Sequence, residues 1–311
     1  TIQASIAYIF LRGEYKVSEE RLKKAISEAY ERGYLGKNIQ GTGFDLDVIV
    51  HTSAGRYICG EETALLNALE GKRANPRAKP PFPQVSGLWG KPTIVNNVET
   101  LCNLPGIIAY GVDWYQGLSV GKDHGTKLFG ISGKIKNPGC WELPLGISIR
   151  ELLEEYGGGM QDGLELRAFL PGGGSTDFML PEHLDVKLDY DEIAKVGSRL
   201  ATGTMILLDN KTCPVGMIGN LMKFFAHESC GFCTPCRDGL PWVDEIFNEF
   251  EGGKGTEKDL QILHEHVDYL GPGKTFCALA PGATAPLGSG LKYFAEDFER
   301  HIKEKRCPYE Y

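Results

Sequence analysis

The first hundred residues alternate between strand-like and helix-like patterns of apolar positions. A continuous apolar run over 6–11 predicts a buried parallel strand, and a helical stripe follows over 18–33 with Ser18 as its N-cap. Alternating apolar positions over 44–50 predict a second strand, and a second helical stripe covers 60–71. This β-α-β-α order predicts an α/β layer on a parallel sheet, taken as part of a Rossmann-like domain.

Residues 71–93 interrupt this alternation. Five prolines stand among five lysines and arginines here, and proline disfavours both helices and inner strands. Phe82 and Trp89 argue against disorder. We therefore expect an ordered, functional or covering loop.

Residues 126–210 have the pattern of a small separate unit. Ser148 is expected to cap a short helix over 149–156. Strand-like runs lie on either side of that helix, at 127–131, 141–143 and 166–170. Strands arranged around one helix, with further strands to follow, predict a β-grasp-like domain.

The last hundred residues carry four helical stripes of apolar positions. A Thr256–Asp259 capping box introduces the third stripe, and the fourth extends over 287–302. Four helices with short connections predict a four-helix bundle. The chain is thus expected to be an α/β protein with three domains, at 1–120, 121–212 and 213–311.

Composition restricts the function more than the fold. Apolar residues make up 42% and charged residues 24% of the 311 positions, which is ordinary for a globular protein. The formal net charge of −8 argues against binding to nucleic acid or to an anionic membrane, since both need a basic surface. No apolar stretch approaches the ~18–20 residues of a membrane span. Glycine is in excess, at 40 residues, and its clusters indicate tight turns or backbone close to a ligand.

Nine cysteines include one tight group, Cys230-x-x-Cys233-x-x-Cys236. Three thiolates at this spacing can surround one face of a [4Fe–4S] cluster, and a fourth from elsewhere completes the ligands. Cys277, expected in a loop between two helices, is the preferred fourth ligand, with Cys213 and Cys307 as competitors. A zinc site, which favours ligands in pairs, and unligated thiols are the alternatives. The odd count is unlike a disulfide framework.

Three further motifs are candidates for cofactor contacts. Gly60-Glu61-Glu62 begins a helix, either as acids matched to the helix dipole or as a place where a ligand approaches Gly60. Asn96-Asn97-x-Glu99-Thr100 is either a helix cap at Asn97 or a polar site for sugar or phosphate groups. Lys79-Pro80-Pro81-Phe82-Pro83 either presents a cation and an aromatic ring to a nucleotide or is a polyproline cover.

These segments occur in one order, together with Tyr57 and Ala74-Asn75-Pro76-Arg77. As a combination they resemble the family of flavin-carrying, NADH-binding subunits of respiratory complex I, the F subunits of the NADH:quinone oxidoreductases, over essentially the whole chain. The resemblance implies an NADH dehydrogenase subunit with hydride transfer from NADH to FMN, then single-electron transfer to a [4Fe–4S] cluster and onward to quinone. A flavin suits this role because it links two-electron and one-electron carriers.

The resemblance also implies roles for individual positions. The cluster ligands would be Cys230, Cys233, Cys236 and Cys277. The segment against the flavin would comprise Tyr57, Gly60, Glu61 and Glu62. Glu61 and Glu62 are the catalytic candidates, because their charges act on the reduced flavin and NAD⁺. The FMN ribityl and phosphate would be held by Asn96, Asn97 and Thr100. The residues near NADH would be Lys79 and Phe82, with Phe82 on the adenine side.

The partners implied by the resemblance are a thioredoxin-like [2Fe–2S] subunit and a large multi-cluster subunit. The chain would then lie in the peripheral arm on the cytoplasmic or matrix side of a membrane complex, without inserting into the membrane itself. The family carries a glycine-rich flavin loop and an acidic nucleotide segment ahead of the position where this sequence begins. We therefore expect half of a flavin site here, and weak FMN binding by this chain alone.

Three other functions are compatible with parts of the pattern. The first is the diaphorase subunit of an NAD-linked hydrogenase or formate dehydrogenase. The second, from another class, is a non-catalytic electron-transfer or scaffold subunit. The third is a zinc-stabilised interaction module, which predicts a colourless protein.

Overall fold

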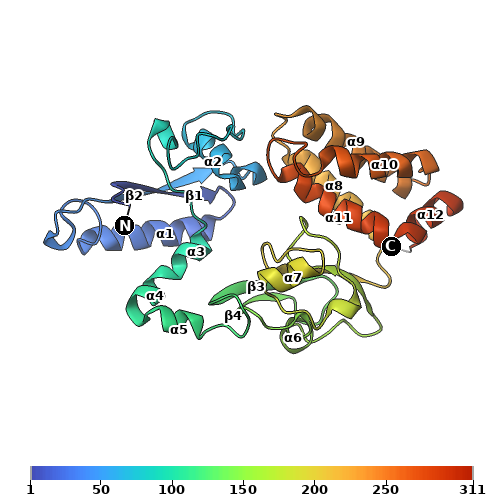
Figure 1. Ribbon diagram of the computed structural model, residues 1–311, viewed down its shortest axis with the longest axis horizontal. Coiled ribbons are helices and arrows are strands. Elements are labelled where there is room, and N and C mark those ends of the chain that lie inside the picture. The colour runs from blue at the N-terminus through green and yellow to red at the C-terminus, as the bar shows by residue number, and fades with distance from the viewer. Residues whose placement is uncertain (1, 310–311) are drawn as a thin grey trace. The chain divides into compact units, whose positions relative to one another are not determined.

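The computed structural model describes residues 2–309, which divide between Val95 and Asn96 into two compact units (Figure 1). The predicted domain boundaries near 120 and 212 stay predictions. Within residues 2–309, no helix combines the length and the apolar character that crossing a membrane requires.

The first unit contains a small α/β layer. Strands β1 (Ile6–Arg12) and β2 (Asp47–Ser53) pair in parallel, and α1 (Lys16–Glu31) connects them. The expected cap at Ser18 is wrong, because the N-cap of α1 is Tyr15, three residues earlier. The expectation of a buried strand is also wrong. Residues of β1 are exposed or half-buried, because the described sheet of this unit has two strands and little to cover them.

The end of β2 leads into the second helix of this unit. One 3-10 turn (Tyr57–Gly60) precedes α2 (Glu62–Leu69), close to the predicted position. The proline-rich segment 71–93 is an ordered loop with one 3-10 turn (Leu88–Gly90), as predicted.

Arg77 attaches this proline-rich segment to α2. Its Nε donates a hydrogen bond to Asn67 Oδ1 at 2.9 Å, and its Nη1 donates to the carbonyl of Gly87 at 2.9 Å. Its Nη2 lies 2.7 Å from Oε1 of Glu70, a carboxylate whose side chain is only 5% exposed. One arginine therefore connects the last turn of the helix to both ends of the loop.

The second unit begins with three short helices, α3 (Val98–Cys102), α4 (Leu104–Tyr110) and α5 (Val112–Gln116). A mixed four-stranded sheet follows, in the order β4-β3-β6-β5. Its strands are β3 (Thr126–Ser132), β4 (Gly139–Pro144), β5 (Leu166–Leu170) and β6 (Thr204–Asp209). The β3–β6 pair is parallel, and the β3–β4 and β5–β6 pairs are antiparallel.

A short helix packs into the core of this sheet. It comprises α6 (Ile149–Glu151) and a wider turn (Leu152–Tyr156). Ser148 caps it as predicted, and Glu151 completes a capping box. Ile149 and Leu152 are fully buried in one core cluster with Phe129 and Phe169 of the sheet. A further helix, α7 (Tyr190–Lys195), precedes β6. A mixed α/β architecture is therefore present here.

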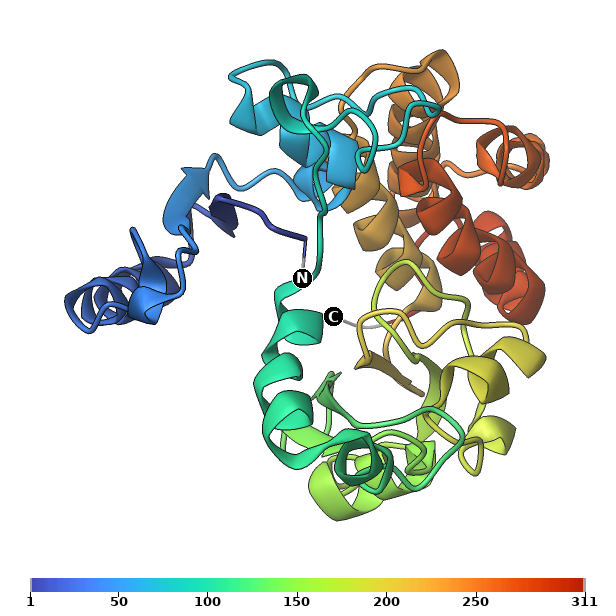
Figure 2. The same ribbon diagram turned by 60° about the vertical axis from the view of Figure 1, so that its left-hand side comes forward.

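The C-terminal part of the second unit is helical, and Figures 1 and 2 both show these orange to red helices gathered together. They are α8 (Pro214–Glu228), α9 (Thr234–Glu251), α10 (Glu257–Leu270), α11 (Leu279–Tyr293) and α12 (Ala295–Glu304). The Thr256–Asp259 capping box precedes α10 as predicted.

The prediction of four helices is wrong for residues 2–309, where the predicted fourth helix is divided into α11 and α12. Phe294 leaves the helical conformation at φ −121° and ψ 27°. Its buried ring packs edge-on against Phe178, with the ring centroids 5.1 Å apart. The bend at a single residue leaves the apolar periodicity almost unchanged, so the sequence pattern does not reveal it.

Candidate functional site

The four expected cluster ligands lie where two loops meet helix starts. Cys230 and Cys233 stand in the turn between α8 and α9, and Cys236 lies in the first turn of α9. Cys277 lies in the loop just ahead of α11. The rings of Phe232 and Phe276, next to two of these cysteines, pack edge-on with centroids 5.2 Å apart. This contact joins the two cysteine-bearing loops.

The other three thiols act on Cys236 electrostatically. Burial raises the pKa of Cys236 to about 11; a hydrogen bond with Ser229 Oγ at 3.2 Å opposes the rise, and the thiols of Cys233, Cys277 and Cys230 add to it.

The local backbone also fits a cluster. Gly231 has φ +73°, a conformation that glycine adopts without strain, and its backbone nitrogen donates to Ser229 Oγ at 3.2 Å. Four convergent cysteines are the donor set of a [4Fe–4S] cluster. The residues present therefore fit this group. Both competitors for the fourth position, Cys213 and Cys307, lie in another side-chain group.

The candidate flavin residues of the first unit gather at the start of α2. Glu61 is the N-cap, and its Oε2 accepts hydrogen bonds from the backbone nitrogens of Thr63 at 2.9 Å and Ala64 at 2.8 Å. The other oxygen, Oε1, lies 3.3 Å from Lys79 Nζ, and Glu62 pairs with the same ammonium. Glu61 therefore has the structural capping role, while one of its oxygens still faces Lys79.

Lys79 links the proline-rich segment to these two acids. The hydrogen bond with Glu62, opposed by burial and supported by Glu61, raises the pKa of Lys79. The side chain therefore stays cationic at neutral pH, and it is 30% exposed. A phosphate group can replace one of the two carboxylates as the partner of this ammonium group.

Gly60 offers open space beside this group. A Cβ atom added there would meet nothing within 4 Å, so the backbone is accessible to a planar ligand. Tyr57 begins the preceding 3-10 turn, and the Arg12 guanidinium lies 6.0 Å from its ring centroid. Phe82 is 52% exposed in the loop. The open backbone at Gly60 fits the approach of a flavin.

The third motif lies in the second unit. Asn97 caps α3, its Oδ1 accepting from the backbone nitrogen of Glu99 at 2.7 Å, so the structural interpretation of this residue holds. The carboxylate of Glu99 accepts from Leu128 N at 2.8 Å and pairs with Lys127 at 2.9 Å, which attaches α3 to β3. Asn96 and Thr100 are exposed. The flavin candidates are therefore divided between the two units.

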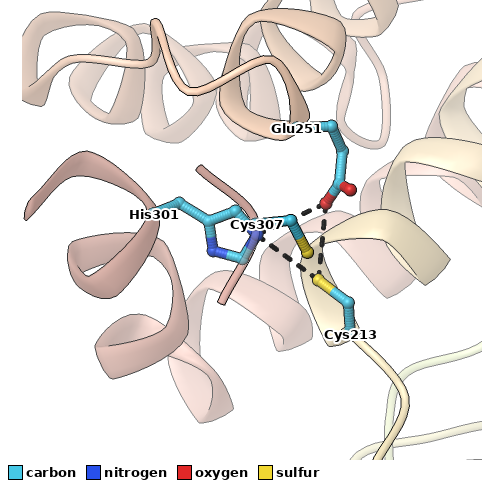
Figure 3. A group of neighbouring side chains, drawn as sticks. All are labelled: Cys213, Glu251, His301 and Cys307. Carbon is cyan, nitrogen blue, oxygen red and sulfur yellow. Dashed lines mark hydrogen bonds and ion pairs between the residues drawn. The ribbon is translucent and has the colours of Figure 1, made fainter. Parts of the chain in front are cut away.

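Sequence reasoning missed a second group of donor atoms, formed by Cys213, Glu251, His301 and Cys307 (Figure 3). Cys213, Glu251 and the pair His301 and Cys307 are far apart along the chain, so no motif signals their proximity. Sequence analysis also missed that Arg77 anchors the proline-rich segment, because it treated this residue only as part of the motif Ala74-Asn75-Pro76-Arg77.

Three family models match the chain in order. The Nuo51 FMN-binding domain matches residues 1–106, the SLBB domain matches 128–177, and the NADH-ubiquinone oxidoreductase-F iron-sulfur binding region matches 216–301. The last range includes all four convergent cysteines. The matches thus define a flavin- and iron–sulfur-binding class of oxidoreductase subunit.

Individual relatives identify the family within this class. The F subunits of NADH-quinone oxidoreductase from Salmonella typhimurium and Escherichia coli are each 58% identical to this chain over 303 residues, 97% of this chain and 68% of each relative. The F subunit from Mycobacterium tuberculosis is 46% identical over 309 residues, 99% of this chain and 69% of the relative. The chain belongs to the family of NADH-quinone oxidoreductase F subunits, which confirms the resemblance noted in the sequence.

A solved structure supports the same architecture. A chain of an NAD⁺-reducing [NiFe]-hydrogenase in the H₂-reduced state superposes with a TM-score of 0.83 at 29% sequence identity. The match covers 99% of this chain and 50% of the hydrogenase chain. The 46–58% identity to the NADH-quinone oxidoreductase relatives is far higher, so the diaphorase alternative is not favoured.

Proposed function

We propose that this chain oxidises NADH and passes the electrons, one at a time, toward quinone through partner subunits. The observation that carries the proposal is that two loops, in contact through Phe232 and Phe276, place four cysteines inside the matched iron-sulfur region: Cys230, Cys233, Cys236 and Cys277. Bound FMN would supply the chemistry that converts a two-electron hydride donor into a one-electron supply for the cluster. The residues of the chain itself would bind and position FMN and NADH and would provide charge near them.

In the first unit, Gly60 leaves the backbone open for the flavin, and Glu61 holds the start of α2 in place by capping it. Glu62 is more available to a ligand than Glu61. Its side chain is 33% exposed and pairs with Lys79, but it does not cap the helix. Lys79 would exchange a carboxylate for a nucleotide phosphate, and the exposed ring of Phe82 would stack on the adenine.

In the second unit, the exposed side chains of Asn96 and Thr100 would bind the ribityl and phosphate groups of FMN. Asn97 would act mainly through the cap that it provides to α3. We assign the mixed sheet with its packed helix to the β-grasp type, because its position matches that of the SLBB model. The proposed partners are a thioredoxin-like [2Fe–2S] subunit and a large multi-cluster subunit, in the peripheral arm of a membrane complex.

The test is the visible spectrum and NADH oxidation of the anaerobically purified full chain, alone and assembled with its partner subunits. We expect iron–sulfur absorbance, about four irons per chain, and electron transfer from NADH to an artificial acceptor once FMN is supplied. The Cys277→Ser variant should lose the cluster's electron paramagnetic resonance signal. The matched control Cys140→Ser changes an exposed cysteine on β4 and should retain that signal.

Two outcomes would exclude the proposal. A colourless chain that contains zinc in place of iron would favour the interaction module. A brown assembled protein that fails to oxidise NADH in the presence of FMN would favour the scaffold role.

A further inference from the structure

A second group of donor atoms lies apart from the four cluster cysteines. Cys213 Sγ, Glu251 carboxylate oxygen, His301 imidazole nitrogen and Cys307 Sγ all lie within 4.8 Å of one another (Figure 3). Among residues 2–309, no other set of three or more such residues meets this spacing. Cys213 Sγ lies 3.4 Å from Glu251 Oε1 and 3.4 Å from His301 Nε2.

The four donors come from separate parts of the helical region. Cys213 is the N-cap of α8, and Glu251 is the last residue of α9. His301 lies in α12, and Cys307 follows α12, beyond the left-handed C-cap residue Lys305 at φ +52°. The group therefore lies where the ends of three elements meet, and Figure 3 shows all four side chains pointing toward one centre.

The hydrogen bond of His301 sets which ring nitrogen faces the group. Its Nδ1 lies 2.6 Å from the backbone oxygen of Asp297, and a carbonyl oxygen only accepts. Nδ1 therefore carries a proton, and in the neutral ring Nε2 presents its lone pair to Cys213 and Glu251. An imidazole that donates its other N–H to a backbone carbonyl is the usual arrangement of a metal-binding histidine.

Two acceptor atoms lie close together in the interior of the group. Nε2 of His301 lies 3.4 Å from Oε1 of Glu251, and both atoms accept hydrogen bonds when the ring is neutral. The thiol of Cys213, a weak donor, donates to Glu251 Oε1. His301 is 1% exposed and Cys213 is 2% exposed, whereas the Glu251 side chain is 28% exposed. A cation at the centre would satisfy all four atoms.

The types of donor atom indicate which cation the group would bind. Two sulfurs, one imidazole nitrogen and one carboxylate oxygen are ligands of zinc, whereas magnesium and calcium prefer oxygen alone. Four protein ligands leave no open position, which is the pattern of structural rather than catalytic zinc. We propose that Cys213, Glu251, His301 and Cys307 form a structural zinc site that joins the start of α8, the end of α9 and the segment around α12.

The test measures metals in the full chain after anaerobic purification from zinc-supplemented cells. We expect about one zinc per chain in addition to the iron, with an X-ray absorption first shell of two sulfurs at about 2.3 Å and two lighter atoms near 2.0 Å. Glu251→Gln, which preserves size, and Cys307→Ser, at a partly exposed position, should each lower zinc affinity at least tenfold in competition with a chromophoric chelator. The control Cys140→Ser should bind zinc like the wild type.

Three results would overturn the proposal. A folded wild-type chain without zinc would exclude the site. A zinc shell of four sulfurs would place the metal on Cys230, Cys233, Cys236 and Cys277 instead. A mass about 2 Da lower on non-reducing analysis, mapped to a bond between Cys213 and Cys307, would mean that these thiols form a disulfide. Iron content measured on the same samples separates these results from failure of the proposed NADH oxidation.

Discussion

Replacing Arg77 by methionine tests whether one side chain holds the proline-rich segment against α2. Methionine keeps much of the apolar stem but loses the guanidinium contacts with Asn67, Gly87 and Glu70. The loss matters most at Glu70, because this carboxylate is only 5% exposed and would keep its charge without its closest guanidinium partner.

The size of the effect follows from these contacts. Removing one partner of a buried ion pair costs about 3–5 kcal/mol, a figure that includes the hydrogen bonds lost with it. Glu70 still retains Lys72 at 2.7 Å and the backbone nitrogen of Trp89 at 2.8 Å, so the lower end applies. We expect a local loss of about 3 kcal/mol, which corresponds to roughly hundredfold faster opening of the segment.

Amide hydrogen exchange followed by mass spectrometry measures this opening directly. The reporters are amides bonded within the segment, such as Ser86 to the carbonyl of Phe82 at 3.0 Å and Thr93 to that of Pro83 at 2.9 Å. Because the segment also carries Lys79 and Phe82, the KM for NADH should rise together with the exchange rate.

The matched control is Lys91→Met, an exposed change in the same segment. Exchange in Arg77→Met within about threefold of the wild type, or equal acceleration in the control, would refute the anchoring role. In the double variant with Glu70→Gln, the combined loss should be smaller than the sum of the single losses, because the two side chains share one interaction.

Three further predictions concern stability. Burial acts to raise the pKa of Glu70, but Lys72, Arg77 and the Trp89 amide outweigh it and lower the pKa to about 2. Its stabilisation is therefore complete above the unfolded value of 4.5 and is lost as the pH falls toward 2, so the difference in unfolding free energy between the wild type and Glu70→Gln should shrink over that window. Glu61→Ala should cost about 1 kcal/mol in urea denaturation through the lost cap, and Glu62→Ala at most about half as much; equal costs would contradict the capping role. Gly253→Ala should lower Tm by more than twice as much as Gly273→Ala. Both glycines have positive φ, but a Cβ at Gly253 would clash with the carbonyl oxygen of Lys305, whereas one at Gly273 would meet nothing within 4 Å. Similar melting temperatures would contradict this.

Local signals were sufficient for much of the architecture. The capping boxes at Ser148 and Thr256 involve residues three positions apart, so a single turn of chain determines them. The α/β order of the first unit and the helical character of the last hundred residues follow from the periodicity of apolar positions alone. The spacing of Cys230, Cys233 and Cys236 likewise indicated a cluster before any packing was known.

Other features depend on contacts between distant elements. The break at Phe294 follows from its packing against Phe178, and the exposure of β1 follows from how little covers the two-stranded sheet. The sequence does not distinguish a glutamate that caps a helix from a glutamate that faces a ligand. The structure shows that Glu61 caps the helix through Oε2, while its other oxygen faces Lys79.

The two groups of cysteines illustrate the same division. The sequence by itself determined that Cys230, Cys233 and Cys236 lie near one another, because close spacing along the chain guarantees proximity, and it predicted Cys277 as the fourth ligand. It left Cys213 and Cys307 as competitors for that position. The tertiary structure decided that these two meet Glu251 and His301 instead, because the ends of α8, α9 and α12 are brought together by the packing of apolar faces and by no short-range signal.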